Sequence, residues 1–369
     1  MKHFRFSLLS LFVLAGILLS SCAGGMMTTS WPGLSGGKDK VYLSVGPSIM
    51  AVKVSDGSLS WKFPADKGDP TRPFYAAPAV TDSQVIVGDY CKAGSLFNAV
   101  PTCTLISLDT ESGNQKWMYG QGKGKWVGSP QLVGDTILAP SADGHLYALN
   151  QNGMPRWIYK TKNSIWAQPV SDGTNAYMAS MDKNLYAVRL SDGTKVWSTA
   201  LIGTVVAGPT LGADGVLYLG TLAKEIVAVN AATGNILWKF ATRGTVWSYP
   251  VLNEEVLYFG DSQSTTAGSV YALSVKTGAL IWSVDLAGPV IASGVKTPDG
   301  LAFVTETGDV QALSLDGKKV WTHNFTKGKL YTTPVVAGDR LVVAITQGDS
   351  ALVALDFNGS QVWSFILPK

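Results

Sequence analysis

The sequence is poor in charge, cysteine and histidine. Charged residues make up 15% of the 369 residues, well below the roughly 25% of an average soluble protein. The 29 basic and 26 acidic residues nearly cancel, which excludes the basic surface of a nucleic-acid-binding protein. Beyond residue 21, no apolar run is long enough to cross a bilayer. Glycine (40) and tryptophan (12) are abundant instead, which favours a turn-rich β protein over a helical bundle or a disordered chain.

The first 30 residues are predicted to be a targeting segment and a tether. A basic start, MKHFR, precedes an apolar stretch at 7–20, which is the arrangement of a secretory signal. The sequence LSSC at 19–22 resembles the bacterial lipoprotein signal, and the resemblance implies cleavage before Cys22 and lipid on its sulfur. We therefore expect a signal peptide at 1–21 and a lipidated Cys22 on a flexible tether at 22–30. The alternative is an ordinary signal with an incidental cysteine.

A lipidated Cys22 implies an extracytoplasmic protein held on a membrane, because two or three acyl chains anchor durably. Ala23 rather than Asp follows the cysteine. In a bacterium with two membranes the resemblance then implies the outer membrane. In a bacterium with one membrane, it implies the outer face of the cell membrane.

The other two cysteines, Cys91 and Cys103, are expected to form a disulfide. Export places them in an oxidising compartment, and they flank a stretch with Gly, Asn and Pro that is typical of a loop. A metal site is disfavoured, because only His145 and His323 follow the signal segment.

The remainder of the chain, 31–369, is one repeat present eight times. A tryptophan ends a common phrase in each copy, as in AVKVSDGSLSW at 51–61 and AVNAATGNILW at 228–238. Most repeats are about 40 residues long, and the longest contains both cysteines. The eight repeated tryptophans are Trp61, Trp117, Trp157, Trp197, Trp238, Trp282, Trp321 and Trp363.

Each repeat is predicted to contain four short strands, A to D. The phrase alternates with period two, and its glycine marks a tight turn before the strand that carries the tryptophan. A β-branched or aromatic run precedes the phrase, and a short strand precedes that run, opened by proline in every copy but the seventh, which has Ser293. Four strands in about 40 residues are typical of a β-propeller blade. We therefore predict an all-β, eight-bladed propeller of four-stranded antiparallel blades.

The repeated tryptophans are interpreted as structural docking residues. A single four-stranded sheet cannot cover both of its faces, so neighbouring blades must pack on it. A buried indole supplies a large contact area, and the small alanine that begins the phrase leaves room for the ring. Eight such contacts explain these tryptophans without any chemistry.

The phrase A-x-[DN]-x-x-T-G-x-x-x-W resembles the tryptophan-docking motif of the pyrroloquinoline-quinone-type propellers, and the resemblance covers 31–369. Two kinds of protein share that motif. Quinoprotein dehydrogenases bind the quinone and calcium in the central funnel. The BamB-type lipoproteins of outer-membrane assembly carry a bare propeller without quinone and dock onto a β-barrel insertase.

The departures from the dehydrogenase pattern favour the BamB type. The chain lacks the adjacent cysteine pair of the dehydrogenases, and its eight blades leave room for excursions only near 90–103 and 261–269. We therefore expect a lipid-anchored, non-enzymatic scaffold that binds a protein partner in the cell envelope and takes no cofactor. Two alternatives stay open. One is a sensor or carrier whose funnel binds a quinone, sugar or peptide. The other is a degenerate dehydrogenase with pyrroloquinoline quinone and calcium.

One face of the ring is predicted to carry the ligand or partner site. Connections from strand D to the next strand A share a face with the B–C turns, and several hold an aromatic residue near a cation. Three interpretations of this face stand. In the first, the aromatics close the mouth by packing on one another while the lysines are solvated. In the second, they form a binding ring for an anionic or extended ligand, peptide or glycan. In the third, the face is a vestigial quinone pocket. The residues of this candidate face are Tyr75, Lys125, Trp126, Trp166, Arg243, Trp247, Lys329 and Tyr331.

No catalytic set is predicted elsewhere. Asp143-Gly144-His145 reads as a turn, and Gly122-Lys123-Gly124-Lys125 lacks the spacing of a phosphate-binding loop. The acidic residues are scattered through turns without an evident acid–base pair.

Overall fold

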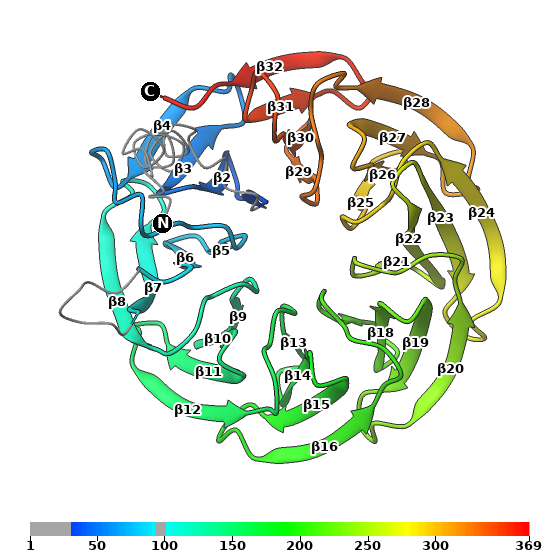
Figure 1. Cartoon of the computed structure of the whole chain (residues 1–369), viewed down its shortest axis with the longest axis horizontal. Helices are drawn as coiled ribbons and strands as arrows, with labels where there is room; N and C mark the ends of the chain where they lie inside the picture. The colour runs from blue at the N-terminus through cyan, green and yellow to red at the C-terminus, as the bar shows by residue number, and fades with distance from the viewer. Residues whose placement is uncertain (1–30, 93–100, 369) are drawn as a thin grey trace, which may run out of the picture. The chain divides into compact units, whose positions relative to one another are not determined.

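Each repeat folds into one four-stranded antiparallel sheet whose strands follow chain order from the axis to the rim (Figure 1). The computed structural model describes residues 31–92 and 101–368. Eight such sheets stand in a ring, so the prediction of an all-β, eight-bladed propeller is confirmed. The described residues contain no helix, and therefore none long and apolar enough to cross a membrane. Signal peptide, Cys22 and tether lie outside the described residues.

The first four blades span 33–200. Blade 1 contains β1 (Gly33–Gly36), β2 (Lys40–Val45), β3 (Ser48–Lys53) and β4 (Leu59–Phe63). Blade 2 contains β5 (Ala79–Val80), β6 (Gln84–Gly88), β7 (Cys103–Asp109) and β8 (Gln115–Gly122). Blade 3 contains β9 (Gln131–Val133), β10 (Thr136–Pro140), β11 (His145–Asn150) and β12 (Pro155–Lys160). Blade 4 contains β13 (Val170–Ser171), β14 (Asn175–Ser180), β15 (Asn184–Arg189) and β16 (Lys195–Ala200).

The last four blades span 210–365. Blade 5 contains β17 (Thr210–Leu211), β18 (Val216–Thr221), β19 (Glu225–Asn230) and β20 (Ile236–Ala241). Blade 6 contains β21 (Val251–Asn253), β22 (Val256–Ser264), β23 (Ala267–Ser274) and β24 (Leu280–Leu286). Blade 7 contains β25 (Val295–Thr297), β26 (Gly300–Val304), β27 (Asp309–Leu313) and β28 (Lys319–Asn324). Blade 8 contains β29 (Val335–Ala337), β30 (Arg340–Ala344), β31 (Leu352–Leu355) and β32 (Gln361–Phe365).

Every repeated tryptophan docks on the next blade. Its indole Nε1 donates a hydrogen bond to a backbone carbonyl in the C–D turn of that blade, as Trp157 does to Leu190 at 2.8 Å. The other donors and acceptors are Trp61 to Thr110, Trp117 to Gln151, Trp197 to Ala231, Trp238 to Val275, Trp282 to Leu315, Trp321 to Phe357 and Trp363 to Val54. The Trp363 bond closes the ring with the same contact that forms the other seven joints.

The glycine of the repeated phrase is the seat of the docked indole. Gly193 has a φ of +73°, and a Cβ built there would lie 2.6 Å from the ring of Trp157. The same juxtaposition recurs at all eight joints, with a φ between +70° and +87° at the glycine. Glycine therefore does two things here: it adopts the left-handed backbone of the turn, and it admits the ring. The alanine of the phrase lies opposite its own tryptophan across the C–D strand pair, as Ala187 does to Trp197.

The hydrophobic core is divided among the joints. Eight clusters of buried side chains are present among the described residues, and each unites two neighbouring blades. The cluster across the closing joint joins Leu43 and Val52 of blade 1 to Val342 and Trp363 of blade 8. Blade 1 takes all four of its strands from the first repeat and blade 8 all four from the last. The ring therefore closes blade against blade without an exchanged strand.

Candidate functional site

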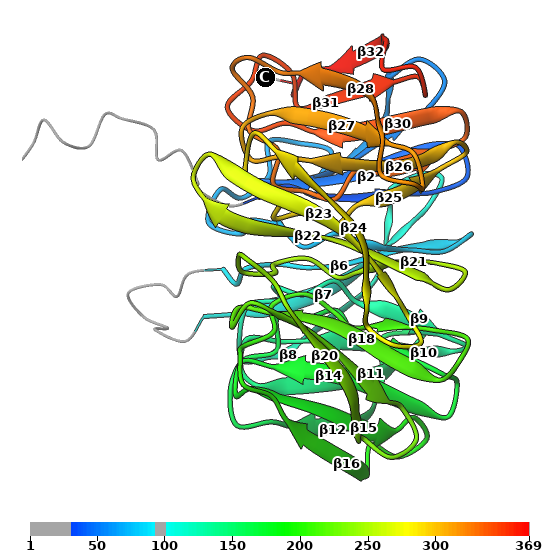
Figure 2. The same ribbon diagram turned by 90° about the vertical axis from the view of Figure 1, so that its right-hand side faces the viewer.

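The connections between blades and the B–C turns lie on the same face of the ring, and backbone hydrogen bonds join them. We call this face the interblade face. The backbone N–H of Trp126 donates to the carbonyl of Asp89 at 3.0 Å, and the N–H of Ala142 donates to the carbonyl of Lys125 at 2.9 Å. One connection thus bridges the B–C turns of blades 2 and 3. The β22–β23 hairpin of blade 6 extends this face, seen edge-on at the left of Figure 2.

The connections contain one inward position. The inward residue lies five positions before strand A and is buried in every connection between two described blades. This set is Phe74, Trp126, Ile165, Val205, Val246, Val290 and Leu330. The next residue is the position of Tyr75, Trp166, Trp247 and Tyr331, and of these four only Tyr75 is buried. Trp126 therefore belongs to the core, although its spacing from a docking tryptophan equals that of Trp166 and Trp247.

The five predicted aromatic residues do not form one ring of stacked side chains. Trp126 is only 1% exposed and packs on Gly88. A Cβ added to Gly88 would lie 2.1 Å from the Cβ of Trp126, so only glycine leaves room for this side chain. Tyr75 is also buried, packed edge-on against Tyr90 with the ring centres 4.9 Å apart. Neither can contact a partner directly in this structure, so only the other three of the five predicted aromatics are accessible.

The other three aromatics reach the surface of the interblade face. Trp166 is 39% exposed. Trp247 is half-buried, and its Nε1 donates to the hydroxyl of Thr245 at 2.8 Å. Tyr331 is half-buried and stacks on Trp31, with the ring centres 5.2 Å apart and the planes within 4°. Among the described residues no aromatic contact joins two of these three rings, and a ligand-binding role for them stays a prediction.

The three predicted cations of the face differ in their partners. Lys125 lies over the ring of Tyr90 at 5.7 Å. Arg243 binds Asp285 through Nη2 and the hydroxyl of Tyr271 at 3.1 Å through Nε. These contacts raise the pKa of Arg243, chiefly through the bond to Asp285, and hold the pKa of Asp285 below its usual value. Lys329 pairs with Glu306 at 3.8 Å. Arg243 is thus committed within the fold, whereas the Lys125 ammonium stays exposed.

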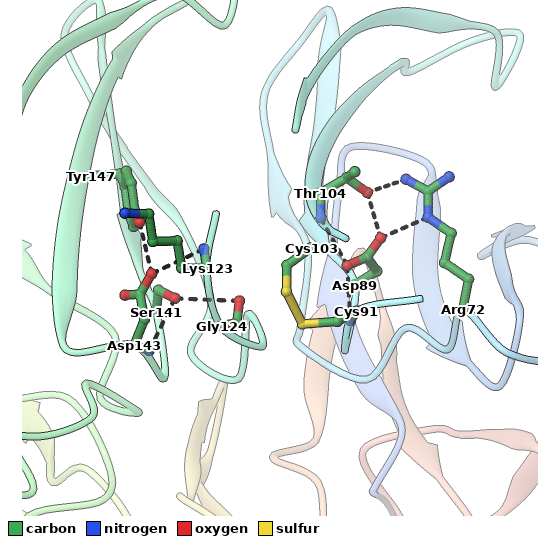
Figure 3. Close-up of a disulfide and its surroundings, with 10 residues drawn as sticks. All are labelled: Arg72, Asp89, Cys91, Cys103, Thr104, Lys123, Gly124, Ser141, Asp143 and Tyr147. Atoms are coloured by element: carbon green, nitrogen blue, oxygen red, sulfur yellow. Dashed lines mark hydrogen bonds and ion pairs between the residues drawn. A yellow bond between two sulfur atoms is a disulfide. The ribbon is translucent and has the colours of Figure 1, made fainter. Parts of the chain in front are cut away.

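Two buried aspartates, Asp89 and Asp261, hold the roots of the two B–C excursions. Asp89 is fully buried and accepts bonds from the backbone N–H groups of Cys91 at 3.0 Å and Thr104 at 2.9 Å, and from Nε of Arg72 at 2.6 Å (Figure 3). The carboxylate is therefore paired and saturated, which is the condition for keeping a charge inside a protein.

Asp261 repeats this arrangement four blades away. It accepts from the N–H groups of Gly244 at 2.7 Å and Ser269 at 2.9 Å and from the Tyr271 hydroxyl at 2.8 Å. Sequence reasoning missed both aspartates. The available signal was a Gly-Asp pair, at 88–89 and at 260–261, that follows the apolar run of strand B in the two repeats with an excursion. The equivalent residues in blades 3, 4, 5 and 7 are the buried hydroxyls Ser141, Ser180, Thr221 and Thr305.

Asp143 and Asp182 stabilise two short B–C turns. Asp143 accepts from the Tyr147 hydroxyl at 2.7 Å and from the N–H of Lys123 at 3.1 Å (Figure 3). Burial disfavours its charged form, but these hydrogen bonds outweigh burial and lower the pKa of Asp143. Asp182 does the same with Tyr186 at 2.7 Å. His145 lies against Asp143, with Nδ1 3.1 Å from its carboxylate, so this stretch is a turn, as predicted.

The predicted disulfide between Cys91 and Cys103 is confirmed (Figure 3). It closes the base of the blade 2 excursion, whose 93–100 segment lies outside the described residues. His323, the remaining histidine, points Nδ1 at the carbonyl of Gly359 at 3.0 Å in the next blade. It lines a hollow of about 300 Å³ between blades 7 and 8, together with Phe325, Lys327 and Asp349.

The described residues contain no cluster of metal-binding side chains. Within 31–92 and 101–368, no three His, Cys, Asp or Glu side chains gather closely enough to hold a metal ion. The two buried aspartates face arginine, hydroxyl and N–H donors of the protein itself. A quinone–calcium centre therefore has no fitted ligand set here, and the absence of a cofactor stays a prediction.

Comparison with known structures identifies the same architecture. The crystal structure of BamB from Moraxella catarrhalis superposes with a TM-score of 0.69 and 19% identity, covering 87% of this chain and 92% of that one. A computationally designed protein, Ika8, superposes with a TM-score of 0.71 and 12% identity, covering 91% of this chain and 96% of that one. At such identities the likeness concerns the fold alone. No curated protein sequence matches the chain significantly.

The family comparison is more specific. The profile of the family described as outer membrane protein assembly factor BamB matches residues 25–206, 181–267 and 266–367. These matches run through all eight blades, and they agree with the resemblance drawn from the repeated phrase. The chain is therefore a member of the BamB family of pyrroloquinoline-quinone-type β-propellers.

Proposed function

We propose that the protein is an extracytoplasmic scaffold, anchored by lipid at Cys22, that docks proteins during outer-membrane protein assembly and carries out no chemistry. The observation that carries this proposal is the match of the BamB family to eight bare blades. The repeated tryptophans, the turn glycines and the buried aspartates are all engaged in holding blades and turns together. In a bacterium with two membranes, the site of action is the inner surface of the outer membrane.

The outer strands offer the means of docking. Each sheet ends in its D strand, which pairs on one side only among the described residues. An extended segment of a partner can add to such an edge through main-chain hydrogen bonds. Exposed apolar side chains flank the docked indoles there, among them Val196, Leu237 and Ile281. The rim therefore combines open backbone with apolar side chains.

The test is made in cells. We expect removal of the protein to lower the amount of β-barrel proteins in the outer membrane, and the wild-type chain to restore it. A photo-crosslinking residue at Val196 or Leu237 should capture a protein of the assembly machinery. The photo-crosslinking residue placed at Lys38, in the A–B turn of blade 1 and away from the rim, should capture no such protein. Unchanged barrel proteins, together with dye reduction by the purified protein loaded with quinone and calcium, would refute the scaffold and favour a dehydrogenase.

A further inference from the structure

Six exposed lysines form an arc on the interblade face of blades 3 to 5. Two lie in the β8–β9 connection, two at or just after the end of β12, and one in each B–C turn of blades 4 and 5 (lower half of the ring in Figure 1). None of the six makes an ion pair with any side chain in the described ranges. We call this set the lysine arc: Lys123, Lys125, Lys160, Lys162, Lys183 and Lys224.

The acids nearest the lysine arc are engaged elsewhere. The carboxylates of Asp143 and Asp182 are turned inward onto the hydroxyls of Tyr147 and Tyr186. Glu225, next to the last lysine, is buried and pairs with Lys239 at 3.5 Å. The positive charge of the arc is therefore presented to solvent without a matching row of exposed acids.

Two apolar side chains project between the lysines. Trp166 is 39% exposed in the β12–β13 connection, and Ile202 is 66% exposed in the β16–β17 connection. A surface that mixes lysine with tryptophan and an aliphatic residue is suited to a membrane interface, where anionic headgroups attract the cations and the apolar groups enter below them.

The chain enters the propeller on this same face. Trp31 directly precedes the innermost strand of blade 1 and stacks on Tyr331 of the β28–β29 connection. Nine residues, 22–30, separate it from the end of the expected signal peptide, and nine residues reach at most about 30 Å. A lipid on Cys22 would therefore hold Trp31, which lies on this face, within about 30 Å of the membrane.

The opposite face carries charges of both signs. Its A–B and C–D turns present exposed aspartates such as Asp56, but Asp192 pairs there with Arg189 and Asp316 pairs with Lys318. Anionic headgroups would therefore be attracted most strongly to the lysine arc, where six cations stand together without acidic partners in the described part of the chain.

We propose that the lysine arc docks the anchored propeller, interblade face down, on anionic phospholipid, with Trp166 and Ile202 entering the headgroup region. The proposal rests on the lipid anchor of the proposed function. It goes beyond that function because it assigns this face to lipid and leaves the rim free for proteins.

The test uses the mature chain with Cys22→Ser, so that binding does not depend on acylation. Equimolar phosphatidylcholine–phosphatidylglycerol vesicles should sediment the protein at low salt, whereas phosphatidylcholine vesicles should not. Added salt should release it, because exposed charges are screened. Replacing Lys160, Lys162 and Lys183 by Gln should weaken binding about 100-fold, at several-fold for each lysine near an anionic surface. Trp166→Ala should weaken it further.

The matched control replaces Lys38, Lys195 and Lys276, which are exposed and lie at the opposite face, by Gln. It removes the same charge and should leave binding unchanged. Equal loss in both triple variants, or no preference for phosphatidylglycerol, would overturn the proposal. Arc-dependent binding of poly-glutamate without vesicle binding would make the arc a site for acidic protein segments and refute the lipid assignment. Because the vesicles contain no protein, either result leaves the scaffold test in cells independent.

Discussion

The seat of the docked indole can be tested by adding a single methyl group. In blade 4, Gly193 lies under Trp157 with a φ of +73°, whereas Gly173 has a φ of +87° and nothing within 4 Å of its would-be Cβ. Alanine at either position must adopt a left-handed backbone, at a cost of about 1–2 kcal/mol. Only at Gly193 does the new methyl overlap a ring, which adds about 1–3 kcal/mol.

We therefore expect Gly193→Ala to lower the free energy of unfolding by about 2–5 kcal/mol and Gly173→Ala by about 1–2 kcal/mol. Equilibrium urea unfolding measures both, provided that the dependence on urea is the same in the variants compared. Combining Gly193→Ala with Trp157→Ala gives a second reading. With the ring removed, the methyl has room, so the double variant should lose less than the two single variants summed.

Two outcomes would refute this reasoning. Equal losses at Gly193 and Gly173 would mean that backbone conformation alone selects the glycine. Additive losses in the double variant would mean that the methyl and the ring do not meet, since residues in contact are expected to couple by about 0.5–3 kcal/mol.

Three further predictions concern the closing joint, the disulfide and acid stability. Trp363→Phe and Trp238→Phe should each cost about 1 kcal/mol in urea unfolding, because each removes one indole hydrogen bond; a far larger loss at Trp363 would mean that the closing joint differs from the rest. Replacing Cys91 and Cys103 by Ser should cost about 3 kcal/mol, because a loop of this length is then free in the unfolded chain; an unchanged urea midpoint would contradict it. The lowered pKa of Asp143 means that its contribution to stability is present above about pH 4 and is lost as the pH falls through its folded pKa. The free energy of unfolding should therefore fall less steeply with decreasing pH in Asp143→Asn than in the wild type. The same dependence on pH in both proteins would refute this.

The sequence predicts the fold well because the same pattern of strands, turn glycine and tryptophan occurs in every repeat. Eight phrases with the same turn and the same tryptophan leave one architecture, and the order of the strands follows from short connections. The contact between glycine and indole was harder to predict from the sequence. A turn alone accounts for the glycine, and only the structure shows that the tryptophan of the preceding blade packs on it.

The candidate site was harder to predict, since a shift of one residue reverses the direction of a side chain. Trp126 and Trp166 are equally distant from their docking tryptophans, yet the next strand A begins five residues after Trp126 and four residues after Trp166, so Trp126 points inward and Trp166 outward. Asp89 was missed for a different reason. Its partner Arg72 is 17 residues away in the preceding connection, and no local pattern announces that pairing.

The closing joint has a consequence for how the chain can be rearranged. Since blades 1 and 8 meet through the same indole, glycine and apolar seam as any other pair, the linear order of the repeats has no privileged starting point. A circular permutant that joins the present ends by a short linker and opens between blades 4 and 5 would keep all eight joints. By the same logic, duplication or loss of whole repeats leaves every remaining joint of the same kind, which is a simple route by which propellers of different blade number can arise.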